Sequence, residues 1–425
     1  MIYASEFGFS PSSSAEENSI ALANALLSDR EVYIDGDGIA DICNPIYLDD
    51  GASLIFSPTL ILRRNATKQR HNGYVIVNRG AFTKTKNRDI KVKGLRLICN
   101  GVECKSDDVQ SDFCVPGLRG HLAFHYIENL TVEDIEILDL PKEDFGIHVC
   151  TFENITVKNV HIEGKKDAVH LGKGRGFQIR DGLFRTFDDP IALNAHDYAC
   201  SNPELGWIED GVIENCRELD EEQTTGFFCR ILAGSWVDWK KGMIIRNSDT
   251  VVNAGRLYRA YMRSDGKEYV STTPPTHEKG TETLDGIVWV MVQEGNEHSA
   301  GCRNIVFRNI TLEKHRPVAF SLHFDNDNWS HSVYPYSEMP VQSNILFENI
   351  KVKAPIKSFI STATPVENIT VRNSDLGDGI ISLFAISGVE GISYKKSDIT
   401  IENCKHRQDE DFIRISGREA KIEIK

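Results

Sequence analysis

A nine-residue segment that recurs along the chain limits the possible folds more than any other feature of the sequence. In each copy, apolar and polar residues alternate on both sides of a polar corner formed by Asn, Asp or Gly. This pattern is typical of two short β-strands joined by a tight bend. The clearest copies begin at Asn129, Asn154, Asn304, Asn344 and Asn368, and weaker copies begin at Asp89, Gly176 and Asp398.

The spacing of the copies predicts how these strands are arranged. The interval from Asn129 to Asn154 is 25 residues, and the interval from Asn154 to Gly176 is 22 residues. A period in the low twenties, with hardly any helix between copies, predicts a parallel β-helix in which no coil can bury its apolar side alone. Leucine-rich repeats have a similar period, but their leucine consensus is absent here. We therefore predict one all-β solenoid domain over residues 1–425.

The Asn residues of the repeat allow two interpretations. Asn129, Asn154, Asn309 and Asn368 are each followed by x-Thr, which is the pattern of a glycosylation site. Their regular position in the repeat favours a structural role instead, in which corner side chains stack and hydrogen-bond between coils. We expect the structural role.

Two regions interrupt the repeat. Residues 1–45 are expected to form an N-terminal cap with the first strands, because Ser14 begins an amphipathic helix and Glu17 follows three residues later as in a capping box. Such a helix would cover the open end of the solenoid. A long polar loop insertion is expected over residues 255–300, as the wall of a cleft or as a subunit contact.

The charge of the chain argues against several classes of partner. Asp and Glu number 62 against 48 Lys and Arg, which gives a net charge of −14, and no run of basic residues stands out. Nucleic acid and anionic membrane are therefore not expected as partners. The ten cysteines lack zinc-site spacing and the N-terminus lacks a signal peptide, so the sequence as written predicts a cytoplasmic protein. It would be a secreted protein if a signal peptide has been removed.

Three aspartates form the candidate catalytic group. Asp188 and Asp189 follow Asp167 by 21 and 22 residues, which is one coil. Because stacked coils lie roughly 4.8 Å apart, the three carboxyl groups should converge on one patch of the outer surface. At least one of them should then keep a proton beside an ionised neighbour, which is what glycosidic bond cleavage requires. A solvated acidic turn and a Ca²⁺ site are the alternatives.

Other polar residues near this group are candidates for binding a substrate. They follow the aspartates on the same strand, lie one or two coils away, or border the expected insertion, and Arg side chains there could bind carboxylates or hydroxyls. The irregular loop over residues 323–331 could bind sugar or calcium. The substrate-binding candidates are His170, Asn194, His196, Asp197, Arg230, Arg256 and Arg259.

The N-terminal helix and the following Val-Tyr-Ile strand resemble the pectin-lyase-like superfamily, which implies a right-handed parallel β-helix. The aspartate pattern looks like that of glycoside hydrolase family 28, the polygalacturonases and their relatives, and the Asp-Asp-Pro-Ile segment is similar to family 110 α-galactosidases. This resemblance implies inverting hydrolysis, with Asp188 as the acid and Asp167 and Asp189 as the base.

The chain departs from family 28 at three places. Lys165 and Lys166 precede Asp167 where the family usually has Asn-Thr, and Phe228-Cys229-Arg230 stands where it has Gly-His-Gly. The family's Arg-x-Lys, which binds the uronate carboxylate, has no clear counterpart in this sequence.

We therefore expect a glycoside hydrolase that needs no cofactor and acts on an oligo- or polysaccharide, either a pectic, uronic-acid glycan or a galactose-containing one. One alternative is a polysaccharide lyase that uses calcium held by the aspartates. Another is a glycan-binding or phage-spike β-helix without catalysis.

Overall fold

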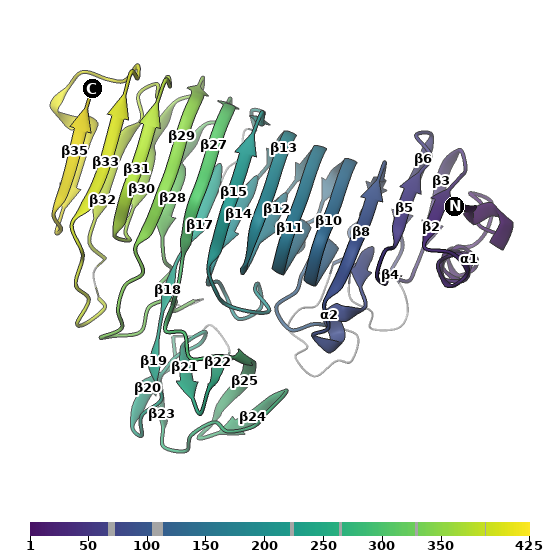
Figure 1. Cartoon of the computed structure of the whole chain (residues 1–425), viewed down its shortest axis with the longest axis horizontal. Coiled ribbons are helices and arrows are strands. Elements are labelled where there is room, and N and C mark those ends of the chain that lie inside the picture. Colours follow the sequence, from purple (N-terminus) through teal and green to yellow (C-terminus); the bar gives the residue numbers. More distant parts are fainter. Residues whose placement is uncertain (67–72, 104–113, 222–224, 263–265, 328–329, 387) are drawn as a thin grey trace.

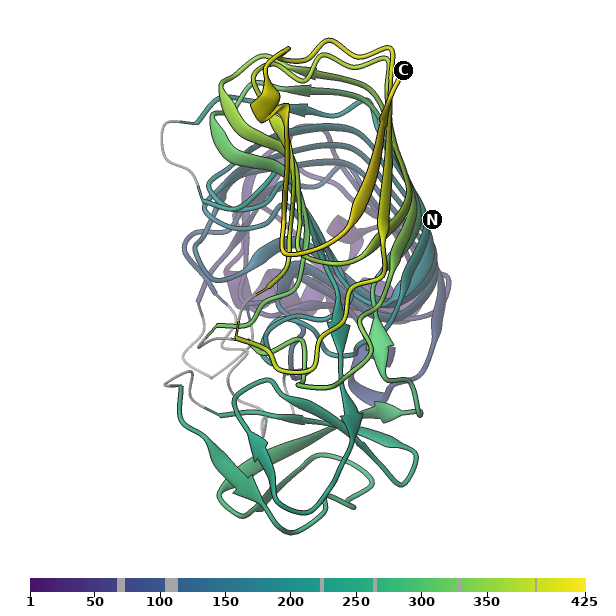
Figure 2. The same cartoon turned by 90° about the vertical axis from the view of Figure 1, so that its left-hand side faces the viewer.

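The computed structural model describes residues 1–425 except 67–72, 104–113, 222–224, 263–265, 328–329 and 387. Its coils stack along one long axis, from helix α1 (Ala15–Ser28) near the N-terminus to strand β35 (Ala420–Ile424) at the other end (Figure 1). Figure 2 views the stack from the end where the C-terminus lies, with successive coils wound one behind another. The predicted right-handed parallel β-helix is confirmed.

Three strips of parallel strands run along the axis, and one of them carries the aspartates. This first strip contains short strands, which each pair with the equivalent strand one coil earlier and one coil later. In order, it comprises β4 (Ile46–Leu48), β7 (Ile76–Asn78), the starts of β10 (Gly120–Leu140) and β11 (Phe145–Gly164), β12 (Val169–Leu171), β14 (Ile191–Asn194), β17 (Cys229–Leu232), β28 (Arg316–His323), β30 (Ile356–Thr362), β32 (Ile380–Phe384) and β34 (Ile413–Ser416).

The second and third strips lie on either side of the polar corners of the repeat. The second comprises β1 (Ile2–Tyr3), β2 (Glu31–Ile34), β5 (Ser53–Phe56), β8 (Asn87–Lys93), the middles of β10 and β11, β13 (Gly174–Thr186), β15 (Ile208–Glu214), β27 (Cys302–Leu312), β29 (Gln342–Val352), β31 (Val366–Arg372), β33 (Ser397–Glu402) and β35. The third comprises β3 (Gly38–Ile42), β6 (Leu60–Arg64), β9 (Arg96–Ile98), the ends of β10, β11 and β13, β16 (Arg217–Glu218), and the ends of β27 and β29.

The core follows from the alternation within each strand. Side chains at every second position point inward, so the same position of successive coils forms an apolar column along the axis. One such column is in register through eight coils and is almost completely buried. Its members are Val132, Val157, Ile179, Ile213, Phe307, Phe347, Val371 and Ile401.

The polar corners form ladders, as predicted for the Asn residues of the repeat. Asn344 has a φ angle of 55°, in the left-handed region that Asn tolerates better than most residues. Its side-chain amide donates to Asn304 at 3.0 Å, and its side-chain oxygen accepts from Asn368 at 2.7 Å. A second ladder includes the bond from Asn349 to Asn309, at 2.7 Å. These bonds confirm the structural role of the corner Asn residues.

The N-terminal helix is also confirmed. The Ser14 side chain accepts a hydrogen bond from the backbone of Glu17, and the Glu17 side chain accepts one from the backbone of Ser14. Helix α1 buries Ala21, Leu22 and Ala25 against the first coils. No helix in the described part of the chain combines the length and the apolar character needed to cross a membrane.

An excursion between β17 and β27 leaves the coil stack (Figure 1). It begins at Gly234, well before the expected insertion over 255–300, and it is a folded unit with its own buried Tyr258 and Trp289. Because its strands do not follow the coil repeat, the repeat pattern could not reveal them. They are β18 (Gly234–Ser235), β19 (Val237–Asp238), β20 (Met243–Ile245), β21 (Thr250–Asn253), β22 (Arg256–Ala260), β23 (Tyr269–Ser271), β24 (Thr281–Leu284), β25 (Ile287–Glu294) and β26 (Ser299–Ala300).

The ladder makes a prediction about stability. Asn344→Ala removes two side-chain hydrogen bonds and places Ala in the left-handed region, so the free energy of unfolding should fall by about 1–3 kcal/mol. Asn344→Gly loses the same bonds but accepts the backbone conformation, and it should therefore lose less. Urea unfolding of both variants measures this difference. Equal stability of the Ala variant and the wild type would contradict the role of the ladder.

Candidate active site

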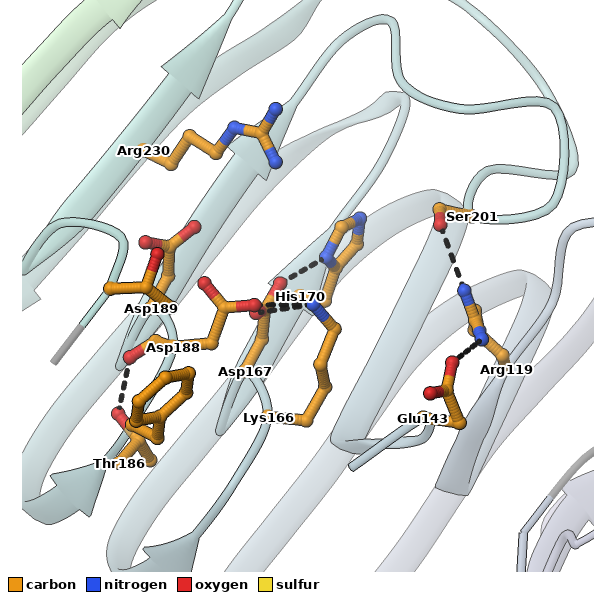
Figure 3. Close-up of polar contacts among 12 residues, drawn as sticks. Arg119, Glu143, Lys166, Asp167, His170, Thr186, Asp188, Asp189, Ser201 and Arg230 are labelled. Atoms are coloured by element: carbon orange, nitrogen blue, oxygen red, sulfur yellow. Dashed lines mark hydrogen bonds and ion pairs between the residues drawn. The ribbon is translucent and has the colours of Figure 1, made fainter. Parts of the chain in front are cut away.

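The three aspartates lie just before two strands of the first strip. Val169 of β12 pairs with Ile191 of β14, so Asp167 and Asp189 occupy equivalent places in successive coils. The backbone amide of Ala168 donates to the carbonyl of Asp189 at 3.1 Å, which fixes this register. One carboxyl oxygen from each of Asp167, Asp188 and Asp189 lies within 4.8 Å of the other two (Figure 3). The structure thus brings the three predicted catalytic carboxyl groups together.

These carboxyl groups are more buried than an outer surface patch would be. Asp167 is 3% exposed and Asp189 is 1% exposed, whereas the side chain of Asp188 is 21% exposed. Asp188 is therefore the member of the group that is most open to solvent. The next coil approaches closely at Gly226, whose φ is 67° and where a Cβ atom would lie 2.3 Å from Asp189 Oδ1. Only glycine fits this position without displacing the carboxyl group.

A lysine ammonium group lies among the carboxyl groups. Lys166 Nζ forms an ion pair with Asp188 Oδ2 and lies 3.9 Å from Asp167 Oδ1 (Figure 3). Burial disfavours its charge, but Asp167 and Asp188 more than compensate and raise the pKa of Lys166. Clustered carboxylates suit a hard cation such as Ca²⁺. Here the Lys166 ammonium group supplies one positive charge beside two of the three carboxyl groups.

Asp167 and Asp189 differ in their neighbours. Burial favours the neutral form of Asp167, but Lys166, the hydrogen bond with His170 and the charge of Arg230 together hold its pKa below the ordinary value. Burial and then the negative charges of Asp188 and Asp167 raise the pKa of Asp189 well above its ordinary value. Its Oδ1 accepts the backbone amide of Phe227 at 2.6 Å. The surroundings therefore shift the pKa values of these two neighbouring carboxyl groups in opposite directions.

His170 forms a hydrogen bond with Asp167. Its Nδ1 lies 2.9 Å from Asp167 Oδ2, and its ring stacks on Phe145 with centroids 4.0 Å apart. Its Nε2 lies 3.5 Å from Asp197 Oδ2. The His170 side chain is fully buried, so in this structure it orients Asp167 and does not face solvent. Contact of His170 with a substrate stays a prediction.

Arg230 lies on β17, across from Asp189 (Figure 3). It forms an ion pair with Asp325, and its guanidinium group lies over the ring of Tyr198 at 5.6 Å. Burial opposes its charge, but Asp325 and Asp197 raise the pKa of Arg230. Asp325 belongs to the loop expected over 323–331, of which residues 328–329 lie outside the described residues. The sequence did not predict this partner for Arg230.

Asn194 and Asp197 begin a loop that leaves β14. The amide of Asn194 donates to Asp197 Oδ2 at 2.7 Å, and Asp197 Oδ1 accepts the backbone amide of Tyr198 at 2.7 Å. Both side chains are buried. They shape the loop next to His170, and binding of a substrate by them stays a prediction.

His196 and Arg259 connect this loop to the excursion. His196 Nε2 lies 3.3 Å from Thr250 Oγ1, and burial lowers the pKa of His196 to about 3, so its ring is neutral. Arg259 donates to the backbone carbonyls of Asp197 and Asn202. Both side chains are buried and hold the excursion against the coil that carries the aspartates. Arg256 instead pairs with Glu278 and Glu294, within the excursion.

Arg316 supports the backbone of Asp188 and was not predicted. It forms a fully buried ion pair with Glu218 at 2.6 Å, and it donates to the backbone carbonyl of Asp188 at 3.0 Å. Lys314 donates to the carbonyls of Thr186 and Phe187, immediately before Asp188. The sequence signal for these residues is weak, because they lie more than 120 residues after the segment that they hold.

A family model, glycosyl hydrolases family 28, matches residues 22–202 of this chain, which is less than half of its length. The matched segment contains all three aspartates. No curated protein matches the sequence significantly. The resemblance to family 28 that the aspartate pattern suggested is confirmed by the family match.

Solved structures with similar folds share little sequence with this chain. A family 28 exopolygalacturonase from Yersinia enterocolitica is 12% identical, with a TM-score of 0.50, and the match covers 100% of this chain and 78% of that one. A hyperthermoactive exopolygalacturonase from Thermotoga maritima is 11% identical, with a TM-score of 0.50 and coverage of 100% and 91%.

Bacteriophage phi29 gene product 12 in its pre-mature form matches equally well in fold, with 11% identity, a TM-score of 0.50 and coverage of 99% and 51%. Similarity at this level establishes the fold alone, and the fold is shared by proteins of unlike activity. The chain is thus a parallel β-helix whose residues 22–202, with the three aspartates, carry the sequence signature of glycosyl hydrolase family 28.

Proposed function

We propose that this protein is a glycoside hydrolase that cleaves a glycosidic bond in a pectic glycan, at a uronic-acid or galactose residue. One observation carries the proposal: Asp167, Asp188 and Asp189 come from two successive coils and lie within 4.8 Å of one another. They lie in the segment that matches the family 28 model. The similarity to exopolygalacturonases supports the pectic class of substrate only through the fold.

The electrostatics of the group suit acid and base catalysis. Hydrolysis needs a protonated carboxyl group that donates to the leaving oxygen and a carboxylate that activates water. Asp189 has a raised pKa and Asp167 a lowered one, because burial and like charges act on the first and cations act on the second. A catalytic acid and base usually have environments that shift their pKa values in opposite directions. Asp188, the most exposed carboxyl group, is the one that a glycan reaches first.

Removal of one carboxyl group should abolish most of the activity. Asp167→Asn, Asp188→Asn and Asp189→Asn should each lower kcat/KM by roughly 10²–10⁴-fold, which is the range for positioned acid and base groups. The assay measures new reducing ends from a panel of pectic and galactosyl oligosaccharides.

Asp210→Asn is the matched control, because Asp210 accepts a ladder hydrogen bond from Asn304 at 2.9 Å and lies outside the carboxyl group cluster. It should retain wild-type activity. Full activity in the Asp188 and Asp189 variants would contradict the proposed hydrolase.

The stereochemistry of the product separates two mechanisms. The family 28 resemblance implies inversion, for which carboxyl groups are usually about 6.5–9.5 Å apart, whereas retaining sites have about 5–5.5 Å. Here the nearest oxygens lie within 4.8 Å of one another. We propose inversion, so proton NMR during the first minutes of the reaction should show the anomer opposite to that of the substrate. A first product with the substrate's own anomeric configuration would contradict inversion and agree with the short separation.

A further inference from the structure

The acid and base catalysis proposed above assigns no role to Lys166. Its ammonium group pairs with Asp188 Oδ2, lies 3.9 Å from Asp167 Oδ1 and is 5.8 Å from the centroid of the Phe145 ring. The side chain is 24% exposed, so solvent screens these contacts only in part. The preceding Lys165 is exposed, although it adjoins the same bend.

The contacts of Lys166 are unevenly distributed over the carboxyl groups. Asp188 receives the ion pair, and Asp167 Oδ1, which has no hydrogen-bond partner among the described residues, faces the ammonium group. Asp189 accepts a hydrogen bond from the backbone amide of Phe227, and it lies beside the negative charges of Asp188 and Asp167. Charge repulsion within the cluster is thus relieved at two carboxyl groups and remains at the third.

Two arginines near the cluster form ion pairs with carboxylates outside it, although the charge of Arg230 also acts on Asp167 and Asp189. Arg230 pairs with Asp325, and Arg316 pairs with Glu218 and reaches Asp188 only at its backbone carbonyl. Charged and titratable groups also face the cluster from the elements packed around it. His170 lies on β12, Asp197 in the loop after β14 and Arg230 on β17. Lys314 and Arg316 lie near the start of β28, Asp325 lies in the loop after β28, and Glu221 acts on Lys314.

We propose that Lys166 is a positioning residue, whose ammonium group holds the Asp188 and Asp167 side chains in place and keeps the Asp167 carboxyl group ionised. This inference rests on the proposed hydrolase function only for its consequence in catalysis. The raised pKa of Asp189 and the lowered pKa of Asp167 agree with it.

The first experiment locates the proton in the wild-type protein. Aspartate labelled with ¹³C at Cγ reports each carboxyl group by NMR, and Asp167→Asn, Asp188→Asn and Asp189→Asn assign the three signals. The inference expects the Asp167 signal to be that of an ionised carboxyl group at pH 6 and to titrate at lower pH than the signal of Asp189. An Asp167 signal that is protonated at this pH, or that titrates at higher pH than Asp189, would overturn it. The measurement needs no substrate, so its result is independent of whether the protein hydrolyses a glycan.

The second experiment removes the charge. Lys166→Met keeps the length of the side chain, and without the cation the titration midpoint of Asp167 should move to higher pH by about 1–3 pH units. The catalytic carboxylate then becomes protonated at a higher pH, so the acidic limb of kcat/KM should move in the same direction. Lys166→Arg should restore both values, because it restores the positive charge.

Lys165→Met is the matched control, since it removes an exposed positive charge one residue away, and it should leave the titration and the pH profile unchanged. Circular dichroism and a thermal melt verify that each variant is folded. An unchanged Asp167 titration in folded Lys166→Met would overturn the inference, as would a shift of equal size in the Lys165 control. Absence of activity in the wild type on every glycan would instead count against the proposed function and leave the NMR result valid.

Discussion

Parallel hydrogen bonding between successive coils determines where every functional group of this protein can lie. The coils that meet at the site are 22 residues apart in sequence, as in the pairing of Val169 with Ile191, and their backbones are held at the spacing of neighbouring strands. Residues at the same place in two coils are therefore forced together, whatever their charge. Apolar columns and Asn ladders benefit from this arrangement, because identical neighbours pack or hydrogen-bond well. Carboxyl groups in the same arrangement repel one another.

The site of this protein is organised around that repulsion. Three carboxyl groups in a buried place cannot all be ionised without nearby positive charge. Lys166 supplies charge to two of them, His170 orients Asp167, and the like charges around Asp189 favour its neutral form. Further out, Arg316 and Lys314 hold the backbone before and at Asp188 through carbonyl oxygens. Lys166 thus supplies part of the positive charge that calcium would supply in a lyase.

Much of this could be predicted from the sequence because it depends on the period. The coil, the Asn ladders and the convergence of Asp167 with Asp188 and Asp189 all follow from positions that recur at 22 to 25 residues. The period fixes backbone positions, but it leaves side-chain directions open, and the pairing of Lys166 with Asp188 was therefore not predicted. The burial of the aspartates, expected on an outer surface, depends on the close approach of the next coil at Gly226.

Contacts between residues on either side of an interruption of the repeat could not be predicted from the sequence either. Gly211 pairs with Ile305, 94 residues later, because the excursion lies between their coils. Arg230 and Asp325 are likewise separated by 95 residues. His196 and Arg259 hydrogen-bond between the excursion and the loop after β14. These contacts could not be predicted, because the strands of the excursion have no period in common with the coils, and substrate binding by both residues stays a prediction.

We propose that the aspartate cluster hydrolyses a glycosidic bond, with the Lys166 ammonium group as a cation beside it. The most direct measurement incubates the purified protein with pectic and galactosyl oligosaccharides, with and without a chelator, and records reducing ends and ultraviolet absorbance together. We expect new reducing ends, no absorbance from unsaturated sugars and no effect of the chelator. Absorbance that appears with the products and disappears with the chelator would contradict the claim, because it would show calcium-dependent elimination.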